Sequence, residues 1–356
     1  MTAGLLPRIR TWRGYRRVFP KAGTWRPGVR AVCARHGLPA RRLSTTPPGT
    51  CVVFRAGPKR LVKLFPPMVA RDAAVEAAAL EAARRAGIPV PRLVARGVLE
   101  DRVAWPYLIL EPVPGRPFRE VLARMPRRDR VAVMASVGRM LRALHRLRIP
   151  LPRPAWPRRI RLLTGAALAA YRRAGSFSPA LRRDLARRLP RLTRPTGSPR
   201  LLHADLNEDH VLVACRRGRW IVTGLIDFAD AEAGDPMYEW MPLWLGLMGR
   251  DPALCRSFLR GYAPGVRVTE AWADRAAAFV LIHAFGPGSV LAALRRDRVD
   301  PAALDWAGLR DRVGPARQGL NAAERVPRGG PAAISRHRVC AVRCAPRPRR
   351  PRAESG

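Results

Sequence analysis

The chain has 356 residues, 47% of them hydrophobic, which is enough to bury a sizeable core and to form a two-lobed domain. Its formal net charge is +41, and only three of its 67 basic residues are lysine. No apolar run reaches the roughly 18 residues that cross a bilayer, and no apolar signal stretch opens the chain, so we expect neither a membrane span nor secretion. Six scattered cysteines include a single close pair, which argues against a structural zinc site.

The beginning of the chain is uniformly basic. Residues 1–71 hold 16 basic residues and no acidic one, so we expect residues 1–42 to be a disordered or loosely ordered basic segment. Such a segment can bind nucleic acid or an anionic membrane surface electrostatically. A general preference for arginine explains the same charge without a partner and is favoured here, because lysine is nearly absent. Proline and glycine interrupt the amphipathic helix that a transit peptide would need.

Residues 49–65 predict two strands joined by a turn. Gly49 and Thr50 begin a turn into an apolar run, and Lys63 is the one charged residue of the second run, Leu61–Phe65. Arginine and lysine are not interchangeable where a compact ammonium is required, so a lysine kept in this arginine-rich chain indicates a specific task. The alternative is an ordinary strand residue that faces solvent.

Residues 72–85 predict a helix that ends before Gly87, because the segment is rich in alanine and glutamate and a glycine follows it. Glu76 and Glu81 are its candidate partners for Lys63. Further along, residues 107–117 predict a buried strand that runs into a proline and glycine break. Residues 131–148 have helical spacing, with His145 on the apolar side, where a core histidine is expected.

The most specific pattern lies between residues 201 and 230. Asp205 and Asp227 each follow a short apolar run, and a basic turn at residues 216–219 separates the runs. This layout predicts a hairpin that returns the chain, so that both carboxylates reach the same cleft. Phosphoryl transfer needs such a pair, because one aspartate orients and deprotonates a hydroxyl while another holds Mg²⁺ on the nucleotide. Turn aspartates are the plainer alternative, but they explain two such contexts poorly.

These residues resemble a known family. The stretch His203-Ala204-Asp205-Leu206 through His210 is similar to the H-x-D-x-x-x-x-N loop of kinases, and Ile226-Asp227-Phe228 stands where kinases carry D-F-G. Together with Gly234-Asp235-Pro236, the pattern resembles the aminoglycoside phosphotransferase family. The resemblance covers roughly residues 45–310. It implies an α+β, two-lobed protein-kinase-like fold, with a small β-rich N-lobe and a larger helical C-lobe.

The resemblance also implies roles for single residues. Asp205 would be the catalytic base, and Lys63, oriented by Glu76, would hold the nucleotide phosphates. Gly49 and Thr50 lie at the position of the nucleotide-covering loop. Glu111 and Val113 mark the hinge between the lobes, where adenine pairs with backbone groups. The implied cofactors are ATP, with GTP as an alternative, and Mg²⁺, with Mn²⁺ as an alternative.

The metal position departs from the family pattern. Asp227 and His210 are the expected metal ligands, but the family has asparagine where this chain has His210. Mg²⁺ prefers oxygen ligands, whereas imidazole suits softer metals. Three readings stay open: His210 ligates a metal less well, it only bonds to Asp205, or the site has lost catalysis. We favour an active enzyme, and we expect His203 to have a structural role.

The expected domains are residues 1–42 (basic segment), 43–113 (nucleotide-binding N-lobe), 114–322 (catalytic and acceptor-binding C-lobe) and 323–356 (arginine- and proline-rich tail, disordered). The region from 235 to 309 predicts helices over 238–248, 253–262 and 269–284. Six acidic residues near the catalytic end permit a cationic acceptor without selecting one: Glu208, Asp209, Asp230, Glu232, Asp235 and Glu239.

The function expected from all this is an ATP-dependent O-phosphotransferase that acts on a small-molecule hydroxyl, for example that of an aminoglycoside-like antibiotic, in the cytoplasm. Homoserine-, choline- or sugar-kinase-like acceptors and a protein hydroxyl stay open. The alternative from another class is a catalytically silent, kinase-like adaptor that binds nucleotide or nucleic acid. Nucleic-acid binding through the basic termini is not favoured.

Overall fold

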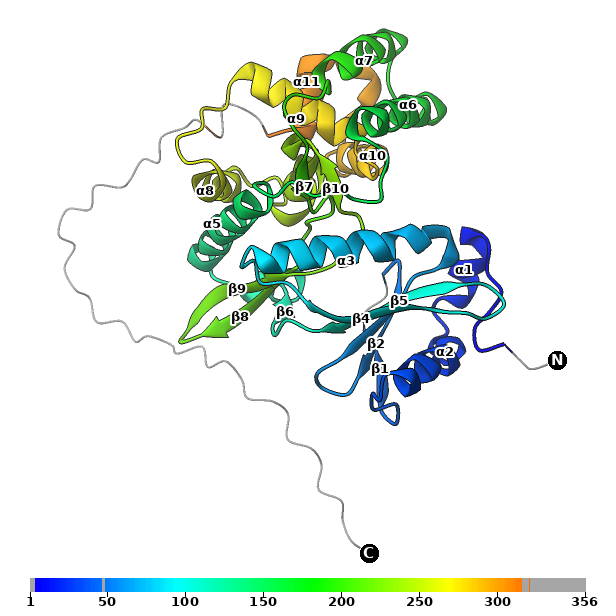
Figure 1. Cartoon of the computed structure of the whole chain (residues 1–356). Helices are drawn as coiled ribbons and strands as arrows, with labels where there is room; N and C mark the ends of the chain where they lie inside the picture. Colours follow the sequence, from blue (N-terminus) through cyan, green and yellow to red (C-terminus); the bar gives the residue numbers. More distant parts are fainter. Residues whose placement is uncertain (1–3, 47–48, 316–319, 321–356) are drawn as a thin grey trace, which may run out of the picture.

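The computed structural model describes residues 4–46, 49–315 and 320, which form a β-rich N-lobe and a helical C-lobe (Figure 1). The N-lobe is a five-stranded antiparallel sheet in the order β1-β2-β3-β5-β4. Its strands are β1 (Leu43–Thr45), β2 (Val52–Ala56), β3 (Leu61–Leu64), β4 (Arg92–Leu99) and β5 (Trp105–Glu111). The α+β class and the kinase-like fold expected from the sequence are therefore confirmed.

Alternation along β3 separates the two faces of this sheet. Val62 and Leu64 are buried in a core on one face, together with Tyr107 and Ile109 of β5. Lys63 points to the other face, because successive side chains of a strand alternate. Helix α3 (Ala70–Arg85) covers that face. It follows the short 3₁₀ helix η1 (Pro67–Val69) and begins two residues earlier than expected.

From residue 4 on the N-terminal segment is folded against the N-lobe, so the expectation of a loose basic arm was wrong for residues 4–42. It forms α1 (Trp12–Val18) and α2 (Ala22–Arg35), which pack on the sheet face opposite α3 (Figure 1). Trp25 of α2 is buried and meets Trp105 of β5, with ring centroids 5.5 Å apart. The arginines of these helices face solvent while a few apolar residues bury the sheet, and net charge alone does not reveal that division.

The C-lobe is built mostly from helices around one core that continues under α3. Two small antiparallel sheets, β7-β10 and β6-β8-β9, lie next to the N-lobe and carry the loops of the site. The strands are β6 (Arg116–Pro117), β7 (Arg200–Leu202), β8 (Val211–Arg216), β9 (Arg219–Leu225) and β10 (Glu232–Gly234). The longer helices are α5 (Arg127–Leu144), α6 (Trp156–Ala174), α7 (Pro179–Leu192), α8 (Pro252–Tyr262), α9 (Glu270–Ile282), α10 (Gly286–Arg296) and α11 (Trp306–Val313). Short pieces are α4 (Phe118–Val121), η2 (Leu122–Arg124), η3 (Pro236–Glu239) and η5 (Pro301–Ala303).

One expected helix has a different form. Instead of an α-helix over 238–248, the chain makes η3 and then a π-helical segment, η4 (Met241–Leu247), with Pro242 near its start. Within the described ranges no single helix has the length and hydropathy of a membrane span; α9 and α10 pass that test only as a pair, bent by 107°. The expected tail, 323–356, lies outside the described residues.

Candidate active site

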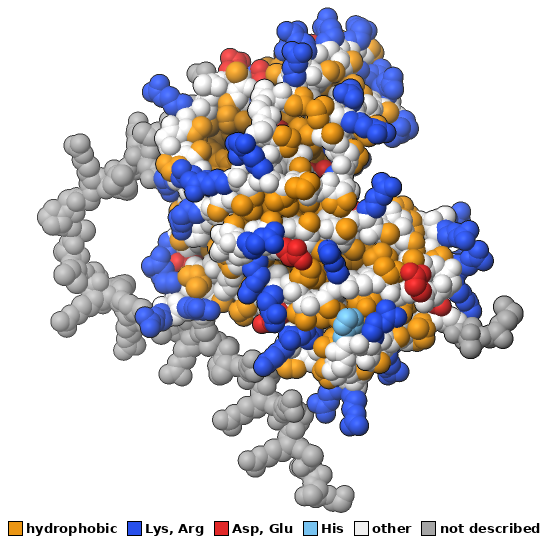
Figure 2. Space-filling view, viewed as in Figure 1, with side chains coloured by type: hydrophobic (Ala, Val, Ile, Leu, Met, Phe, Trp, Pro, Cys, Tyr) orange, Lys and Arg blue, Asp and Glu red, His pale blue; other side chains and the backbone are white. Residues whose placement is uncertain are grey.

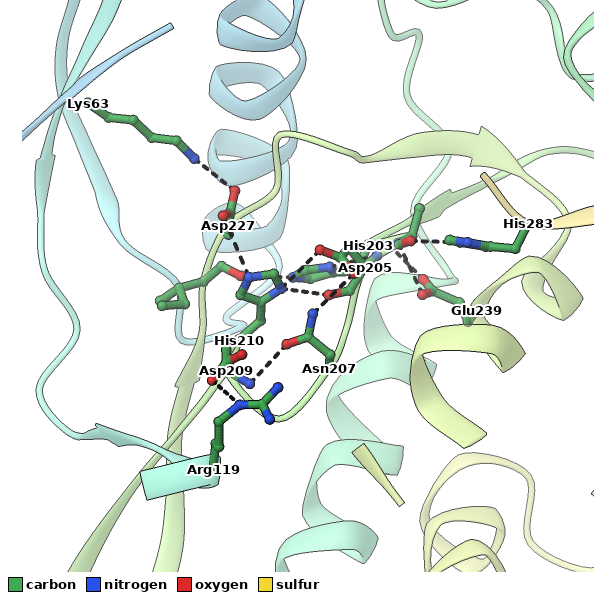
Figure 3. A network of polar contacts seen from close by, with 12 residues as sticks. Lys63, Arg119, His203, Asp205, Asn207, Asp209, His210, Asp227, Glu239 and His283 are labelled. Atoms are coloured by element: carbon green, nitrogen blue, oxygen red, sulfur yellow. Dashed lines mark hydrogen bonds and ion pairs between the residues drawn. The ribbon is translucent and has the colours of Figure 1, made fainter. Parts of the chain in front are cut away.

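Two neighbouring loops carry the candidate catalytic residues. Residues 203–210 join β7 to β8, and the β8–β9 hairpin then returns the chain to Asp227. The Ile226 N–H donates to the His210 carbonyl at 3.0 Å, which ties the end of the hairpin to the end of the loop. The hairpin expected from residues 201–230 is therefore present, and it brings both aspartates to one place (Figure 3).

Lys63 lies between two carboxylates from different lobes. Its Nζ is 2.6 Å from Glu76 Oε2 of α3 and 2.8 Å from Asp227 Oδ1. Burial alone would lower the pKa of Lys63, but Asp227 and Glu76 raise it well above its usual value. The ammonium is therefore charged. Burial also raises the pKa of Glu76 to about 7, against the opposing effect of Lys63. Glu81, the other candidate partner, is exposed.

Asp227 is held as an anion. Burial would raise the pKa of its carboxyl, but Lys63 and then His210 outweigh burial and hold that pKa below its usual range. The residue has a φ of 65°, in the left-handed region that side chains other than glycine seldom adopt. Such strain persists where surrounding contacts fix the conformation, and it is common at functional sites. Lys63 supplies one of those contacts.

Asp205 has a very different environment. Burial raises the pKa of its carboxyl to about 7, His210 opposes this, and the negative charges of Asp230 and Asp227 add to the rise. The Asn207 amide Nδ2 donates to Asp205 Oδ1 at 3.1 Å and so fixes the carboxylate (Figure 3). A carboxyl with a pKa near neutrality, held by one donor, is suited to accept a proton.

His210 lies between the two aspartates. Its Nδ1 is 2.6 Å from the Asp205 carbonyl oxygen, which can only accept, so Nδ1 carries the proton. In the neutral ring Nε2 then has a free lone pair, 3.6 Å from Asp227 Oδ2. In the described part of the chain no three His, Cys, Asp or Glu residues gather as a metal site. A cation here would have Asp227 and His210 as protein ligands and would complete its shell with phosphate and water, as Mg²⁺ commonly does.

The peptide before Asp205 is strained and is held from both sides. Ala204 has a φ of 64°. The buried carboxylate of Glu239 accepts from the N–H groups of His203 at 2.6 Å and Ala204 at 3.1 Å. The ring Nε2 of His283 lies 2.9 Å from the Ala204 carbonyl oxygen. Glu239 and His283 therefore fix the backbone from which Asp205 projects (Figure 3).

His203 is fully buried and acts as a scaffold, as expected. Burial lowers the pKa of its ring to about 4, so the ring is neutral. Its Nε2 lies 3.0 Å from the Ile226 carbonyl oxygen, next to Asp227, and its ring packs on Phe228 with centroids 4.5 Å apart. His203 thus joins the two loops from their buried side.

Comparison with known proteins identifies the family of the chain. A sequence profile described as "Phosphotransferase enzyme family" matches residues 52–277, which include Lys63, Asp205 and Asp227. The chain belongs to this family. The profile begins after α1 and α2, so those two helices lie outside the matched region.

Curated relatives of the family match over part of their length. An aminoglycoside 3'-phosphotransferase of Streptomyces fradiae is 35% identical over 184 residues, which are 46% of this chain and 60% of that protein. One from Streptomyces ribosidificus is 34% identical over 165 residues, which are 43% of this chain and 57% of that protein. The chain thus spans under two thirds of the length of these relatives.

Solved structures show the same fold. The GDP complex of wild-type aminoglycoside 2'-phosphotransferase-IIIa superposes with a TM-score of 0.57 at 18% identity, covering 80% of this chain and 96% of that one. A thermostable mutant of aminoglycoside phosphotransferase APH(4)-Ia, in ternary complex with ADP and hygromycin B, gives 0.52 at 18%, covering 83% and 99%. At this level of identity the match concerns the architecture alone.

Most of the acidic residues near the family motif form ion pairs or hydrogen bonds within the fold. Glu232 pairs with Arg159 at 2.8 Å, Asp235 pairs with Arg275, and Glu239 holds the catalytic loop. Arg119 pairs with both Glu208 and Asp209, at 2.9 and 2.7 Å. Asp230 is the exposed member of the set. Five of the six acids are therefore engaged by other groups of the fold, and Asp230 is the member of the set that stays open to a cationic acceptor.

The expected nucleotide contacts lie at the edges of the N-lobe. Gly49 and Thr50 are exposed in the β1–β2 loop, and the hydroxyl of Tyr15 in α1 donates to the Thr50 carbonyl at 2.9 Å. Glu111 ends β5 with its carboxylate turned to Arg92, whose Nε is 2.9 Å away. Val113 follows it, half-buried. These positions are compatible with backbone contacts to a nucleotide.

The sequence did not predict several residues that contact the two candidate loops. Asn207 was detectable, because it stands two residues after Asp205 and its short amide can turn back to that carboxylate. Arg153 was not detectable. It pairs with Asp72 of α3 at 2.9 Å and donates to the Ala229 carbonyl at 2.6 Å, so it links the N-lobe helix to the loop after Asp227. Residues this far apart in sequence meet only in the folded chain.

Proposed function

We propose that the chain is an ATP-dependent O-phosphotransferase that transfers the γ-phosphate to a hydroxyl of a small molecule of the aminoglycoside type. The observation that carries the proposal is that His210 lies 3.6 Å from both Asp205 and Asp227, with the Lys63–Glu76 pair bonded to Asp227. Family membership supports phosphoryl transfer. The names of the two Streptomyces relatives support the acceptor class.

The nucleotide half of the site uses Lys63 and Asp227. Glu76 holds the Lys63 ammonium in place, so its charge is already oriented toward incoming phosphates. Asp227 and His210 Nε2 face the same gap and fit a divalent cation with two protein ligands. Mg²⁺ bound there would neutralise charge on the phosphates, with Mn²⁺ as the softer alternative. Backbone groups at Gly49, Thr50, Glu111 and Val113 would surround the nucleotide.

The acceptor half of the site uses Asp205. Its carboxylate would accept the hydroxyl proton as the acceptor oxygen attacks the γ-phosphorus and the bond to the β-phosphate oxygen breaks. Asn207 and the Glu239-anchored backbone keep the carboxylate in one orientation. No covalent enzyme intermediate is needed, because the catalytic effect comes from positioning and charge neutralisation. The cytoplasm supplies the nucleotide.

The test is nucleotide consumption against a panel of acceptors. ATP and GTP are offered with Mg²⁺ or Mn²⁺ to aminoglycosides and to simple alcohols, including homoserine, choline and sugars, with Asp205→Ala as the control. Turnover on an aminoglycoside that disappears in the control supports the proposal. Turnover on another alcohol alone would overturn the acceptor class. Bound nucleotide without turnover on any acceptor would instead indicate a catalytically silent, kinase-like adaptor.

A further inference from the structure

Helices α6 and α7 carry an unusual concentration of arginine, and we call residues 156–194 the basic hairpin. It contains eleven arginines and a single acidic residue, Asp184. The hairpin lies at the end of the C-lobe away from the N-lobe, where Figure 2 shows Lys and Arg side chains gathered over α6 and α7. Among the described residues, no hydrogen bond or ion pair joins an arginine of the hairpin to Asp205 or Asp227. The proposed reaction therefore does not account for these arginines.

The two helices use their apolar sides to pack and leave the arginines outside. Ile160 and Leu163 of α6 and Leu185 and Leu189 of α7 are buried in the C-lobe core. Six exposed arginines on these helices have no ion pair or side-chain hydrogen bond recorded among the described residues: Arg158, Arg161, Arg172, Arg173, Arg183 and Arg191. Other arginines are paired, for example Arg159 of the hairpin with Glu232 and Arg250 of the C-lobe with Asp297.

Unpaired like charges on one surface repel one another, and a bound polyanion removes that repulsion. We propose that the basic hairpin binds the sugar-phosphate backbone of double-stranded nucleic acid, without sequence preference. Guanidinium groups bind phosphate oxygens in a two-pronged geometry, and a duplex offers a continuous row of phosphates to a row of arginines. The 19 residues of α6 span about 28 Å at 1.5 Å per residue, somewhat less than one turn of a duplex.

The character of the surface favours a duplex over single strands and membranes. Single-strand binding uses exposed aromatic rings on which bases stack, but Trp156, Tyr171 and Phe177 are all buried. A helix that lies in a membrane interface needs a free apolar face. Here that face is packed, and Leu162 is the one large hydrophobic side chain of α6 and α7 that is strongly exposed, at 55%.

The test compares two variants with the same loss of charge. In the hairpin variant, Arg158, Arg161, Arg172, Arg173, Arg183 and Arg191 become glutamine. In the control variant, six exposed arginines of the N-terminal region become glutamine: Arg8, Arg10, Arg13, Arg16, Arg17 and Arg30. Full-length proteins are titrated with fluorescent duplex DNA and duplex RNA of about 20 base pairs at salt from about 50 to 200 mM. Circular dichroism and thermal melting confirm that both variants fold.

We expect the hairpin variant to bind both duplexes at least about tenfold more weakly at low salt, while the control stays within about twofold of the wild type. The slope of log K against log salt should fall by about 0.9 for each phosphate contact that is lost. Equal weakening of both variants would overturn the proposal, because net charge would then act without a defined surface. So would failure of the wild type to bind duplexes at about 50 mM salt, or hairpin-dependent binding to anionic vesicles alone.

Discussion

Asp205 and Asp227 carry the same chemical group on either side of His210, yet their surroundings shift the pKa of each in opposite directions. Burial and neighbouring carboxylates raise the pKa of Asp205 to about 7. Lys63 and His210 hold the pKa of Asp227 below its usual range. A raised pKa suits a proton acceptor, and a lowered one suits a permanent anion that faces a cation. The difference between the two carboxylates is therefore set by their neighbours, above all by which of them the buried lysine reaches.

The largest effect is expected from removing the carboxylate of Asp205, the proposed proton acceptor. Asp205→Asn keeps the shape of the side chain and its contact with Asn207, but it cannot take the hydroxyl proton. We expect kcat to fall by about 10²- to 10⁴-fold, the usual effect of general-base catalysis, while nucleotide affinity measured by calorimetry stays within about twofold. Wild-type kcat in this variant would contradict the role of Asp205.

Removing the other carboxylate should act on binding. Asp227→Asn takes away the anion that faces His210 Nε2. We expect the Mg²⁺-dependent affinity for nucleotide to fall at least about 10- to 100-fold, because losing even an outer hydrogen-bonding group around a metal has an effect of that size. Nucleotide titrations with Mg²⁺ and with EDTA separate this effect from a general loss of binding. Equal affinities of variant and wild type in Mg²⁺ would count against Asp227 as a ligand.

The raised pKa of Asp205 also predicts a pH-dependent difference in stability in the metal-free protein. Its folded pKa, about 7, lies above the unfolded value of 3.8, so the ionised carboxyl destabilises the fold increasingly as pH rises between these values. Asp205→Asn should therefore raise Tm relative to the wild type, with a difference that grows from about pH 4 to pH 7 and stays level above. Differential scanning calorimetry in EDTA measures this, and a difference independent of pH would show that the pKa is not raised.

Changing the residue between the aspartates should alter which metal supports turnover. His210→Asn replaces an imidazole nitrogen with an amide oxygen, which favours Mg²⁺ over softer ions. We expect the ratio of Mg²⁺- to Mn²⁺-supported kcat/KM to rise several-fold. Kinetics with each metal give the ratio directly. If it does not change, His210 contacts only Asp205 and is not a metal ligand.

The smallest effect is expected from the N-terminal helices, which touch the loop expected to cover the nucleotide. Tyr15→Phe removes the hydrogen bond to the Thr50 carbonyl, worth about 1 kcal/mol, so the KM for nucleotide should rise about fivefold at most, with kcat unchanged. Arg16→Gln on the same helix is the control, since Arg16 is exposed. A change in kcat of similar size would place Tyr15 in a different role.

The sequence by itself determined which residues meet in the candidate site. The spacing of Asp205, His210 and Asp227 predicted a catalytic loop and a returning hairpin, because strand alternation and turn residues are local properties. The lone lysine of an apolar strand and a glutamate on the following helix were likewise predictable, and the folded chain places Lys63 and Glu76 2.6 Å apart.

Only the tertiary structure decided how that chemistry is supported. Glu239, His283, Arg153 and Asp72 act over long sequence separations, so no local pattern marks them. Net charge misled the prediction both for the acidic residues near the site and for the basic N-terminal helices. Four of the six acids near the site pair with arginines from other elements, and the N-terminal helices pack through a few apolar residues that lie among basic ones. Charge counts add over the chain, whereas burial and pairing depend on which groups the fold brings into contact.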